Sequence, residues 1–171
     1  MKKYLLPFSF FVLLAYGCSD AGNNGASVDQ RSYRLGIIGA FGEIVNAGVK
    51  KLALSEPTTP KEMDEMIDEA KVIADRNHVL LYRETELLVT DLFPASYTQG
   101  KEVLLIYQGA TKDEYLTLKQ EVWKLQQEGA YSSTARESIS RRFGKLLSYS
   151  DEYITKLMAE NAAGASSVKS Q

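Results

Sequence analysis

Residues 103–107 read VLLIY, and this short run decides what kind of fold the chain can adopt. An unbroken apolar run of this length is typical of a strand covered on both faces, because a strand with one wet face would alternate apolar and polar residues. Two further apolar runs precede it, at residues 79–82 and 87–91, and Glu84 and Thr85 could form the turn between them. The sequence therefore predicts a three-stranded sheet built from a hairpin and one buried strand, and it leaves the relative direction of the last strand open.

Helical spacing of apolar residues surrounds these strands. Three segments open with a capping box, in which a Thr side chain and a Glu three residues later each bind the other's backbone amide. The pairs are Thr59 with Glu62, Thr111 with Glu114, and Thr134 with Glu137. Apolar residues follow each box at the spacing that places them on one helix face. We expect helices at residues 59–77, 111–129, 134–147 and 151–160.

A further helix is predicted at residues 31–54, although the glycines Gly36, Gly39, Gly42 and Gly48 each cost a helix about 1 kcal/mol. The first three recur at every third position, and we interpret them as a strip on which another backbone approaches closely. A phosphate-binding loop is the alternative, but the spacing is neither GxGxxG nor that of a P-loop, and no strand precedes it. The expected fold class is α+β, with the small sheet packed against four to five helices.

The start of the chain divides into the regions of a secretory signal. Lys2 and Lys3 form a basic start, and the apolar run LLPFSFFVLLA follows at residues 5–15. This run is too short to cross a bilayer as a helix, which takes roughly twenty residues. We therefore predict an export signal rather than a permanent membrane span.

Residues 14–18, LAYGC, resemble the lipobox of bacterial lipoproteins, in which a small residue precedes a cysteine. Gly17 and Cys18 fit that pattern, whereas Ala15 stands where the family usually has leucine. In this family the cysteine is acylated and becomes the N-terminus when the signal peptide is cut away. The resemblance covers residues 1–18 only, and it implies lipidation of Cys18, with palmitate as an acyl group, and anchoring to a membrane. An ordinary cleavage site at Ala15 or Gly17 is the alternative, and it would also export the protein.

The expected organisation of the chain follows. Ser19 stands after the cysteine, where aspartate would favour retention at the inner membrane, so the preferred location is the outer membrane of the cell envelope, on its periplasmic or surface face. Small polar residues at both ends of the mature chain predict segments that cannot bury apolar surface. We expect a signal peptide at residues 1–17, a flexible tether at 18–30, a single domain at 31–160 and a disordered tail at 161–171.

Composition excludes several classes of function. Cys18 is the only cysteine, so no intramolecular disulfide can form, and His78 is the only histidine. Zinc sites of the usual composition are therefore excluded, and we expect no metal and no cofactor. Removal of Lys2 and Lys3 with the signal leaves 18 basic against 22 acidic residues, a net charge of −4. A mildly acidic domain has no electrostatic case for binding nucleic acid.

The candidate catalytic residues are three carboxylates near the predicted hairpin, Glu84, Glu86 and Asp91, with His78 as a helper. Held close together, the carboxylates could act as an acid and base pair or bind a hard cation such as calcium. The favoured alternative is a solvated hairpin edge, whose charges discourage pairing with another sheet. For His78 the favoured alternative is a capping role at the end of a helix, where an imidazole interacts with the last carbonyls.

The candidate ligand-binding residues are Tyr82, Phe93, Tyr97 and Lys101. Two of them lie in the segment 91–100, which is longer than a typical connection, and loops of that length often carry a function. Phe93 and Tyr97 could line a pocket or a contact surface, or they could fold back on the core.

Three functions remain open on these observations. The preferred one is a lipid-anchored bacterial envelope protein whose domain binds a protein partner or a small ligand without catalysing a reaction. The second is an envelope enzyme that uses the acidic residues of segment 82–101. The third is a homo-oligomeric structural protein of the envelope, in which the glycine-striped helix pairs with its twin.

Overall fold

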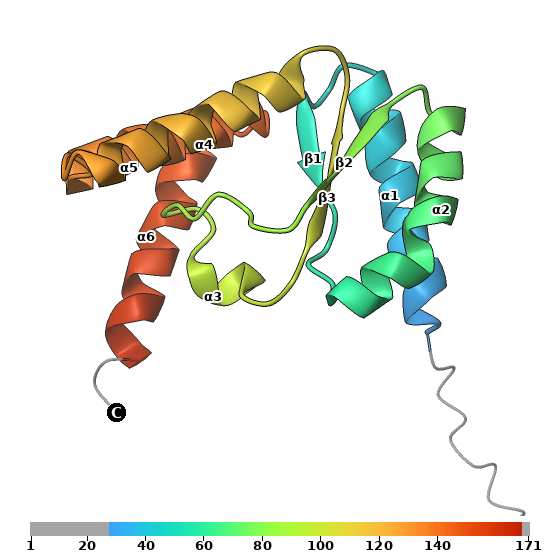
Figure 1. Ribbon diagram of the computed structural model, residues 1–171, viewed down its shortest axis with the longest axis horizontal. Helices are drawn as coiled ribbons and strands as arrows, with labels where there is room; N and C mark the ends of the chain where they lie inside the picture. The colour runs from blue at the N-terminus through green and yellow to red at the C-terminus, as the bar shows by residue number, and fades with distance from the viewer. Residues whose placement is uncertain (1–27, 169–171) are drawn as a thin grey trace, which may run out of the picture.

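The sheet of the computed structural model, which describes residues 28–168, lies between two layers of helices (Figure 1). Its strands are β1 (Leu52–Leu54), β2 (Leu80–Glu84) and β3 (Val103–Tyr107), in the order β1-β3-β2. Both outer strands run antiparallel to β3. The predicted α+β class, with a small three-stranded sheet packed against helices, is confirmed.

Six helices accompany the sheet within the described residues. One layer contains α1 (Gln30–Asn46) and α2 (Pro60–Arg76), and the opposite layer contains α4 (Thr111–Gln127) and α5 (Ser133–Leu146) (Figure 1). The short α3 (Ala95–Thr98) lies between β2 and β3 in the chain, and α6 (Asp151–Val168) follows α5.

Every residue of β3 is buried, as the apolar run predicts. Leu104 and Ile106 pack with the core side chains of α1 and α2, whereas Val103, Leu105 and Tyr107 pack with those of α4 and α5. Alternate side chains of β3 thus pack into two separate cores, so both faces of the strand are buried. This explains why the run contains no polar residue.

The predicted hairpin is wrong, because residues 87–91 form no strand. After β2 the chain leaves the sheet, and helix side chains satisfy its amides. Leu88 N–H donates to the hydroxyl of Tyr115 (3.0 Å), and Asp91 N–H donates to Ser140 Oγ (3.0 Å). The apolar side chains of Leu87 and Leu88 are buried against α4 and α5, so their hydrophobicity reflects core packing rather than strand pairing.

The third strand is instead β1, which comes from the segment predicted as one helix at residues 31–54. The helix α1 ends at Asn46, and Gly48 then adopts a φ of 74°, a left-handed conformation that glycine tolerates and that stops a helix. The three residues of β1 pair with β3 at Leu105, Ile106 and Tyr107. The short apolar run of β1 continues the helical spacing of the preceding residues. The spacing of apolar residues alone cannot distinguish a short strand from the end of a helix.

One of the three predicted capping boxes is present. Glu62 N–H donates to Thr59 Oγ1 (3.3 Å), and Thr59 N–H donates to Glu62 Oε2 (2.9 Å). The helix α4 has Ala110 at its N-cap, and α5 is capped by Ser132, whose hydroxyl accepts from Ala135 N–H (3.2 Å). The helices themselves lie where helical spacing predicts them.

Two of the three glycines in the predicted strip of α1, Gly39 and Gly42, let α2 approach closely. A Cβ built on Gly42 would lie 3.0 Å from the Cβ of Asn77, and one on Gly39 would lie 3.6 Å from Ile73 Cγ2. The same device joins α5 to α6, since a Cβ on Gly144 would lie 2.6 Å from Ile154 Cγ1. Gly36, in contrast, faces open space.

The two ends of the chain differ from the predicted boundaries. The helix α6 continues to Val168, and Asn161 Nδ2 donates to the carbonyls of Asp91 (2.7 Å) and Leu92 (3.0 Å), so most of the predicted tail at 161–171 is helical. At the other end Asp29 caps α1, and α1 therefore begins inside the predicted tether 18–30. The predicted signal peptide at 1–17 and Cys18 lie outside the described residues. Within residues 28–168, no helix combines the length and the apolar character needed to span a membrane.

Candidate functional site

The strand β1 has a free edge. It is the outermost strand on its side of the sheet, and Ser55 N–H donates to the Leu104 carbonyl (2.9 Å), which directs the amide of Ser55 toward β3. Leu54 lies opposite Leu105, and because hydrogen-bonded and non-hydrogen-bonded pairs alternate along an antiparallel ladder, the amide and carbonyl of Leu54 point away from β3. A groove of about 360 Å³ lies along this edge.

Two walls bound this groove, which we call the β1 groove. Ile37 and Phe41 of α1 form one wall, and Ala53 and Leu54 of β1 lie between the walls. The other wall comes from two segments far apart in the sequence and contains Phe93, Tyr97, Leu147 and Tyr149. The surfaces are therefore mainly apolar and aromatic, which is typical of a binding cleft.

The end of α5 positions Leu147 and Tyr149. Ser148 has a φ of 62°, its amide donates to the Lys145 carbonyl (2.9 Å), and Tyr149 N–H donates to the Gly144 carbonyl (3.0 Å). This pair of hydrogen bonds is a Schellman motif, which reverses the chain at the end of a helix. Ser148 Oγ also accepts from Lys51 N–H (2.9 Å), so the turn is fixed to the residues that lead into β1.

Aromatic stacking and a local turn position Phe93 and Tyr97. The centroid of the Phe93 ring lies 5.6 Å from the centroid of the Phe143 ring in the core and 5.7 Å from that of the Tyr97 ring. Thr90 Oγ1 accepts from the amides of Leu92 (3.2 Å) and Phe93 (3.3 Å), which holds the loop in shape. Of the two placements left open by the sequence, a pocket lining or a fold back on the core, the structure has both residues lining the β1 groove and Phe93 also packed against the core.

Lys50 supplies a positive charge at one end of the β1 groove. Its ammonium donates to the Leu147 carbonyl (2.7 Å) and lies 4.6 Å from the centroid of the Tyr149 ring. No carboxylate of the described residues forms an ion pair with it, and burial lowers the pKa of Lys50. A half-buried cation without a counter-ion can gain free energy by binding an anion.

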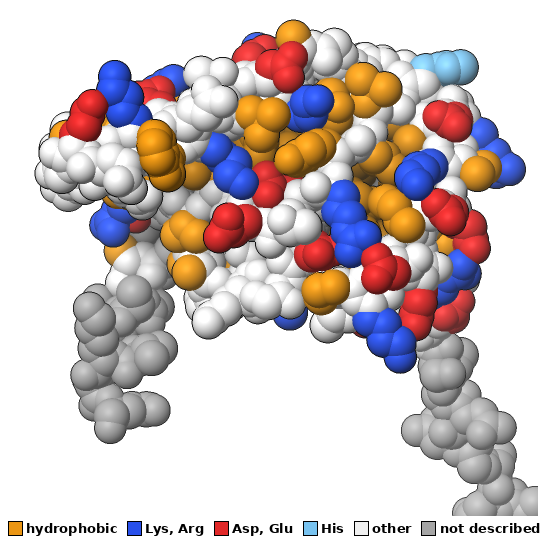
Figure 2. Space-filling view, in the orientation of Figure 1, with side chains coloured by type: hydrophobic (Ala, Val, Ile, Leu, Met, Phe, Trp, Pro, Cys, Tyr) orange, Lys and Arg blue, Asp and Glu red, His pale blue; other side chains and the backbone are white. Residues whose placement is uncertain are grey.

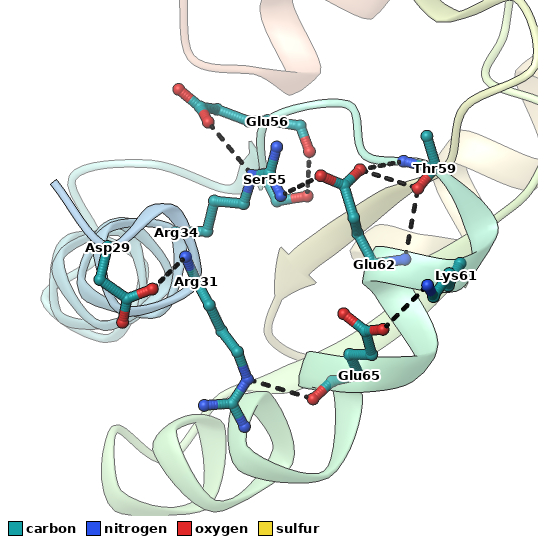
Figure 3. Close-up of polar contacts among 9 residues, drawn as sticks. All are labelled: Asp29, Arg31, Arg34, Ser55, Glu56, Thr59, Lys61, Glu62 and Glu65. Carbon is teal, nitrogen blue, oxygen red and sulfur yellow. Dashed lines mark hydrogen bonds and ion pairs between the residues drawn. The ribbon is translucent and has the colours of Figure 1, made fainter. Parts of the chain in front are cut away.

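Glu56 supplies a negative charge at the other end. Its carboxylate points toward Arg34 and lies 3.8 Å from Arg34 Nε (Figure 3). Arg34 also donates to Glu62 Oε1 (2.8 Å), the carboxylate of the capping box of α2. The hydrogen bonds from Arg34 and then from Thr59 lower the pKa of Glu62 to about 2. This ion-pair cluster ties α1, α2 and the segment after β1 together.

The tyrosines of the groove remain neutral donors at physiological pH. Burial, and then the negative charge of Glu56, raise the pKa of Tyr97. Burial, followed by the neighbouring Tyr153 and Tyr97, raises the pKa of Tyr149. The groove therefore offers apolar surface, neutral hydroxyls, one ammonium and the outward main-chain groups of Leu54, a combination suited to binding.

The structure separates the candidate catalytic carboxylates. Glu84, only 3% exposed, lies with both carboxylate oxygens 3.0 Å from Lys119 Nζ. Burial, and then the charge of Glu84, raise the pKa of Tyr115 far above its usual range. Glu86 is exposed and joins this cluster through its backbone, since its amide donates to Glu84 Oε1 (2.8 Å). The cluster holds the chain after β2 against α4.

Asp91 and His78 lie elsewhere. The carboxylate of Asp91 forms an ion pair with Arg136 Nε (3.0 Å) on α5. His78 is exposed and adopts a φ of 55° at the end of α2, where its amide donates to the Asp75 carbonyl (3.1 Å). The backbone of His78 therefore caps the helix, rather than the imidazole as predicted. No group of three or more metal-binding side chains forms within the described part of the chain.

The other two candidate ligand-binding residues do not line the β1 groove. Tyr82 lies on β2, with Lys112 Nζ 5.7 Å from the centroid of its ring, and Lys101 is exposed just before β3. The sequence reasoning missed Lys50, which fell inside the predicted helix 31–54, and Tyr149, which lies in a turn between helices. An aromatic residue beside two helix ends was the only signal for Tyr149.

The free edge of β2 is less suited to binding. Hydrophobic side chains gather over the sheet on the face seen in Figure 2, and Leu80 of β2 is 52% exposed. However, Arg83 of the same strand donates to Glu102 Oε2 (2.7 Å) and Asp64 Oδ1 (2.6 Å). Charged side chains on an edge strand discourage the addition of another strand.

A hollow of about 440 Å³ between α4 and α5 is lined by four basic side chains. Three of them already have acidic partners, because Arg141 pairs with Glu137, Arg142 with Glu121, and Lys145 with Asp151. The β1 groove is therefore the stronger candidate site.

No family model, curated protein or solved structure matches this chain.

Proposed function

We propose that this protein is a lipid-anchored bacterial envelope protein whose domain binds, without catalysis, a ligand that has an apolar body and an anionic group. One observation carries the proposal: Lys50 stands without an acidic partner at the end of an aromatic groove in the described domain. The anionic group of the ligand would bind the Lys50 ammonium, and its body would lie between Phe41 and Tyr149.

The physical basis is the cost of burying a charge. A cation withdrawn from water loses hydration, and a hydrogen bond to one carbonyl replaces only part of it. An anion that reaches the ammonium in a partly desolvated groove gains more than it would at an open surface, because the local dielectric constant is lower. Apolar contacts with the walls add roughly 25 cal/mol for each Å² removed from water.

The enzyme alternative loses support from the placement of the acidic residues. The carboxylates of Glu84 and Asp91 each bind an internal cation, on α4 and α5 respectively. A general acid and base pair needs two groups within reach of one substrate. The oligomer alternative loses support because α2 already covers Gly39 and Gly42 of the glycine strip.

The proposed membrane location rests on the lipobox-like sequence LAYGC at residues 14–18. Acylation of Cys18 would anchor the protein to the outer membrane, which we prefer because Ser19 follows the cysteine. Mass spectrometry of the N-terminal peptide of the native protein tests this directly. Acyl chains on residue 18 would support this location, and an unmodified N-terminus elsewhere, or membrane binding that survives Cys18→Ala, would overturn it.

Ligand binding is tested with two small probes of the same shape. We would titrate the full-length protein in lipid nanodiscs with 4-phenylbutyrate and with its neutral amide, using calorimetry and empty nanodiscs as blanks. The carboxylate should bind, and both its replacement by the amide and the substitution Lys50→Met should weaken binding about tenfold or more. Lys51→Met is the matched control, because Lys51 lines the hollow beside α4 instead. Equal heats for acid and amide would contradict the proposal.

A further inference from the structure

The β1 groove lies beside the sheet, in the same gap between the two layers of helices. Beyond the free edge of β1, one wall is the α1 surface at Phe41, and α1 covers one face of the sheet. The opposite wall contains Phe93, which packs on the core under the other face. Side chains of an added strand would point alternately to these two walls, as strand geometry requires.

Main-chain groups inside the groove match an extended backbone. The amide and carbonyl of Leu54 point outward, because Leu54 forms a non-hydrogen-bonded pair with Leu105, whereas the neighbouring Ser55 binds Leu104 through its amide and through Oγ, which accepts from Leu104 N–H (2.8 Å). A donor and an acceptor on one residue, side by side on a strand edge, are the pair that a second strand binds. A small rigid ligand satisfies such a pair less readily than a peptide does.

The Lys50 ammonium at one end of the groove sets a direction for the added strand. The chain of β1 runs from Lys50 toward Glu56, so an antiparallel partner runs from Glu56 toward Lys50. The last residue of such a partner would meet the Lys50 ammonium, which has a hydrogen-bonded carbonyl on one side and the Tyr149 ring on the other. A free C-terminal carboxylate supplies the anion that this position lacks.

We propose that the β1 groove binds the free C-terminal end of an extended polypeptide, which adds to β1 as an antiparallel strand and places its terminal carboxylate on Lys50. This inference rests on the proposed function, because it assigns a ligand class to the same groove. The three residues of β1 span about 10 Å, so the bound segment is short, about three or four residues. Its apolar side chains alternate between the Phe41 wall and the Tyr149 wall.

The test begins with selection from defined peptide pools. Full-length protein in nanodiscs is mixed with acetylated pentapeptides of randomised apolar sequence that end in a free carboxylate, and with the same pool ending in an amide. Bound peptides are identified by mass spectrometry, and the dissociation constant of an enriched peptide is measured by calorimetry. We expect enrichment from the carboxylate pool, and a loss of about 10-fold to 100-fold when the terminus is amidated or Lys50 becomes Met. Lys51→Met should change nothing.

Methylation of single peptide amides tests the strand geometry. Only alternate amides of an added strand face β1, so N-methylation should weaken binding at every second position and spare the positions between. Uniform effects along the peptide, or equal enrichment of the amidated pool, would overturn the inference. If 4-phenylbutyrate binds in a Lys50-dependent manner while no peptide does, the proposed function stands and the peptide inference fails. If neither probe binds, both fail.

Discussion

The ammonium of Lys119 lies 3.0 Å from each carboxylate oxygen of Glu84, and it also donates to the Glu86 carbonyl (2.7 Å). This ion pair fixes the place where the chain leaves β2 and turns along α4. It also shows that a buried carboxylate can have a structural role, because both carboxylate oxygens of Glu84 already accept hydrogen bonds.

Removal of the cation from this pair should destabilise the protein. Lys119→Met leaves Glu84 buried with a negative charge and no counter-ion, and such changes cost about 3 kcal/mol. Chemical denaturation would measure the loss. Lys124→Met on the same helix, where the side chain is 71% exposed, serves as the control and should change stability by less than about 0.5 kcal/mol. Equal effects of both variants would contradict the structural role of the pair.

Two glycines in helices should respond to alanine in opposite directions. Gly144→Ala places a Cβ within 2.6 Å of Ile154 Cγ1, so the buried Ile154 side chain or α6 itself must shift, and we expect a loss of about 1 to 3 kcal/mol. Gly36→Ala meets nothing within 4 Å and should raise stability by about 0.5 to 1 kcal/mol through helix propensity. Thermal and chemical denaturation of both variants would check this. Stabilisation by Gly144→Ala would mean that α6 does not pack as described.

His78→Gly should stabilise the protein. The residue has a φ of 55°, which glycine adopts without the steric penalty of a Cβ, and its backbone forms the cap of α2. The expected gain in the free energy of unfolding is about 0.5 to 1 kcal/mol. His78→Ala keeps the Cβ and should give no such gain. A loss of stability in His78→Gly would reveal a role for the imidazole that the backbone contacts do not explain.

The ion pair and hydrogen bonds of Glu62 should make the free energy of unfolding depend on pH in the acidic range. The pKa of Glu62 is lowered from 4.5 to about 2 in the folded protein, so the folded state binds its proton less readily than the unfolded state. The contribution is therefore complete above about pH 4.5 and is lost as the pH falls toward 2. Glu62→Gln should reduce the decline in unfolding free energy between about pH 5 and pH 3. Identical pH profiles for variant and parent would contradict the assigned pKa.

The elements that the sequence predicts correctly depend on local signals. β3 is recognisable because burial on both faces leaves five apolar residues in a row, and α2 is recognisable from the capping box of Thr59. β1 is not recognisable, because Leu52, Ala53 and Leu54 acquire strand structure only by pairing with a segment much later in the chain. The same holds for residues 87–91, whose amides bind side chains of α4 and α5 that no local pattern specifies.

The residues of the candidate site also divide into those that a local sequence feature predicts and those that it does not. Phe93 and Tyr97 could be predicted, because a long loop with aromatic residues is a local feature. Lys50 and Tyr149 could not, because their proximity depends on the turn at Ser148 and on its contact with Lys51. The carboxylates of Glu84 and Asp91 are close in sequence, yet their cationic partners lie on α4 and α5, and no local pattern specifies how these two helices pack against the segment.

The central position of β3 also governs when the protein can fold. Both β1 and β2 pair only with β3, which is the last of the three strands to leave the ribosome. Until residue 107 has been synthesised, neither earlier strand has a partner, and the nascent chain holds no sheet. The two cores on the opposite faces of the sheet can therefore be completed only after β3 is available, because each of them contains side chains of that strand.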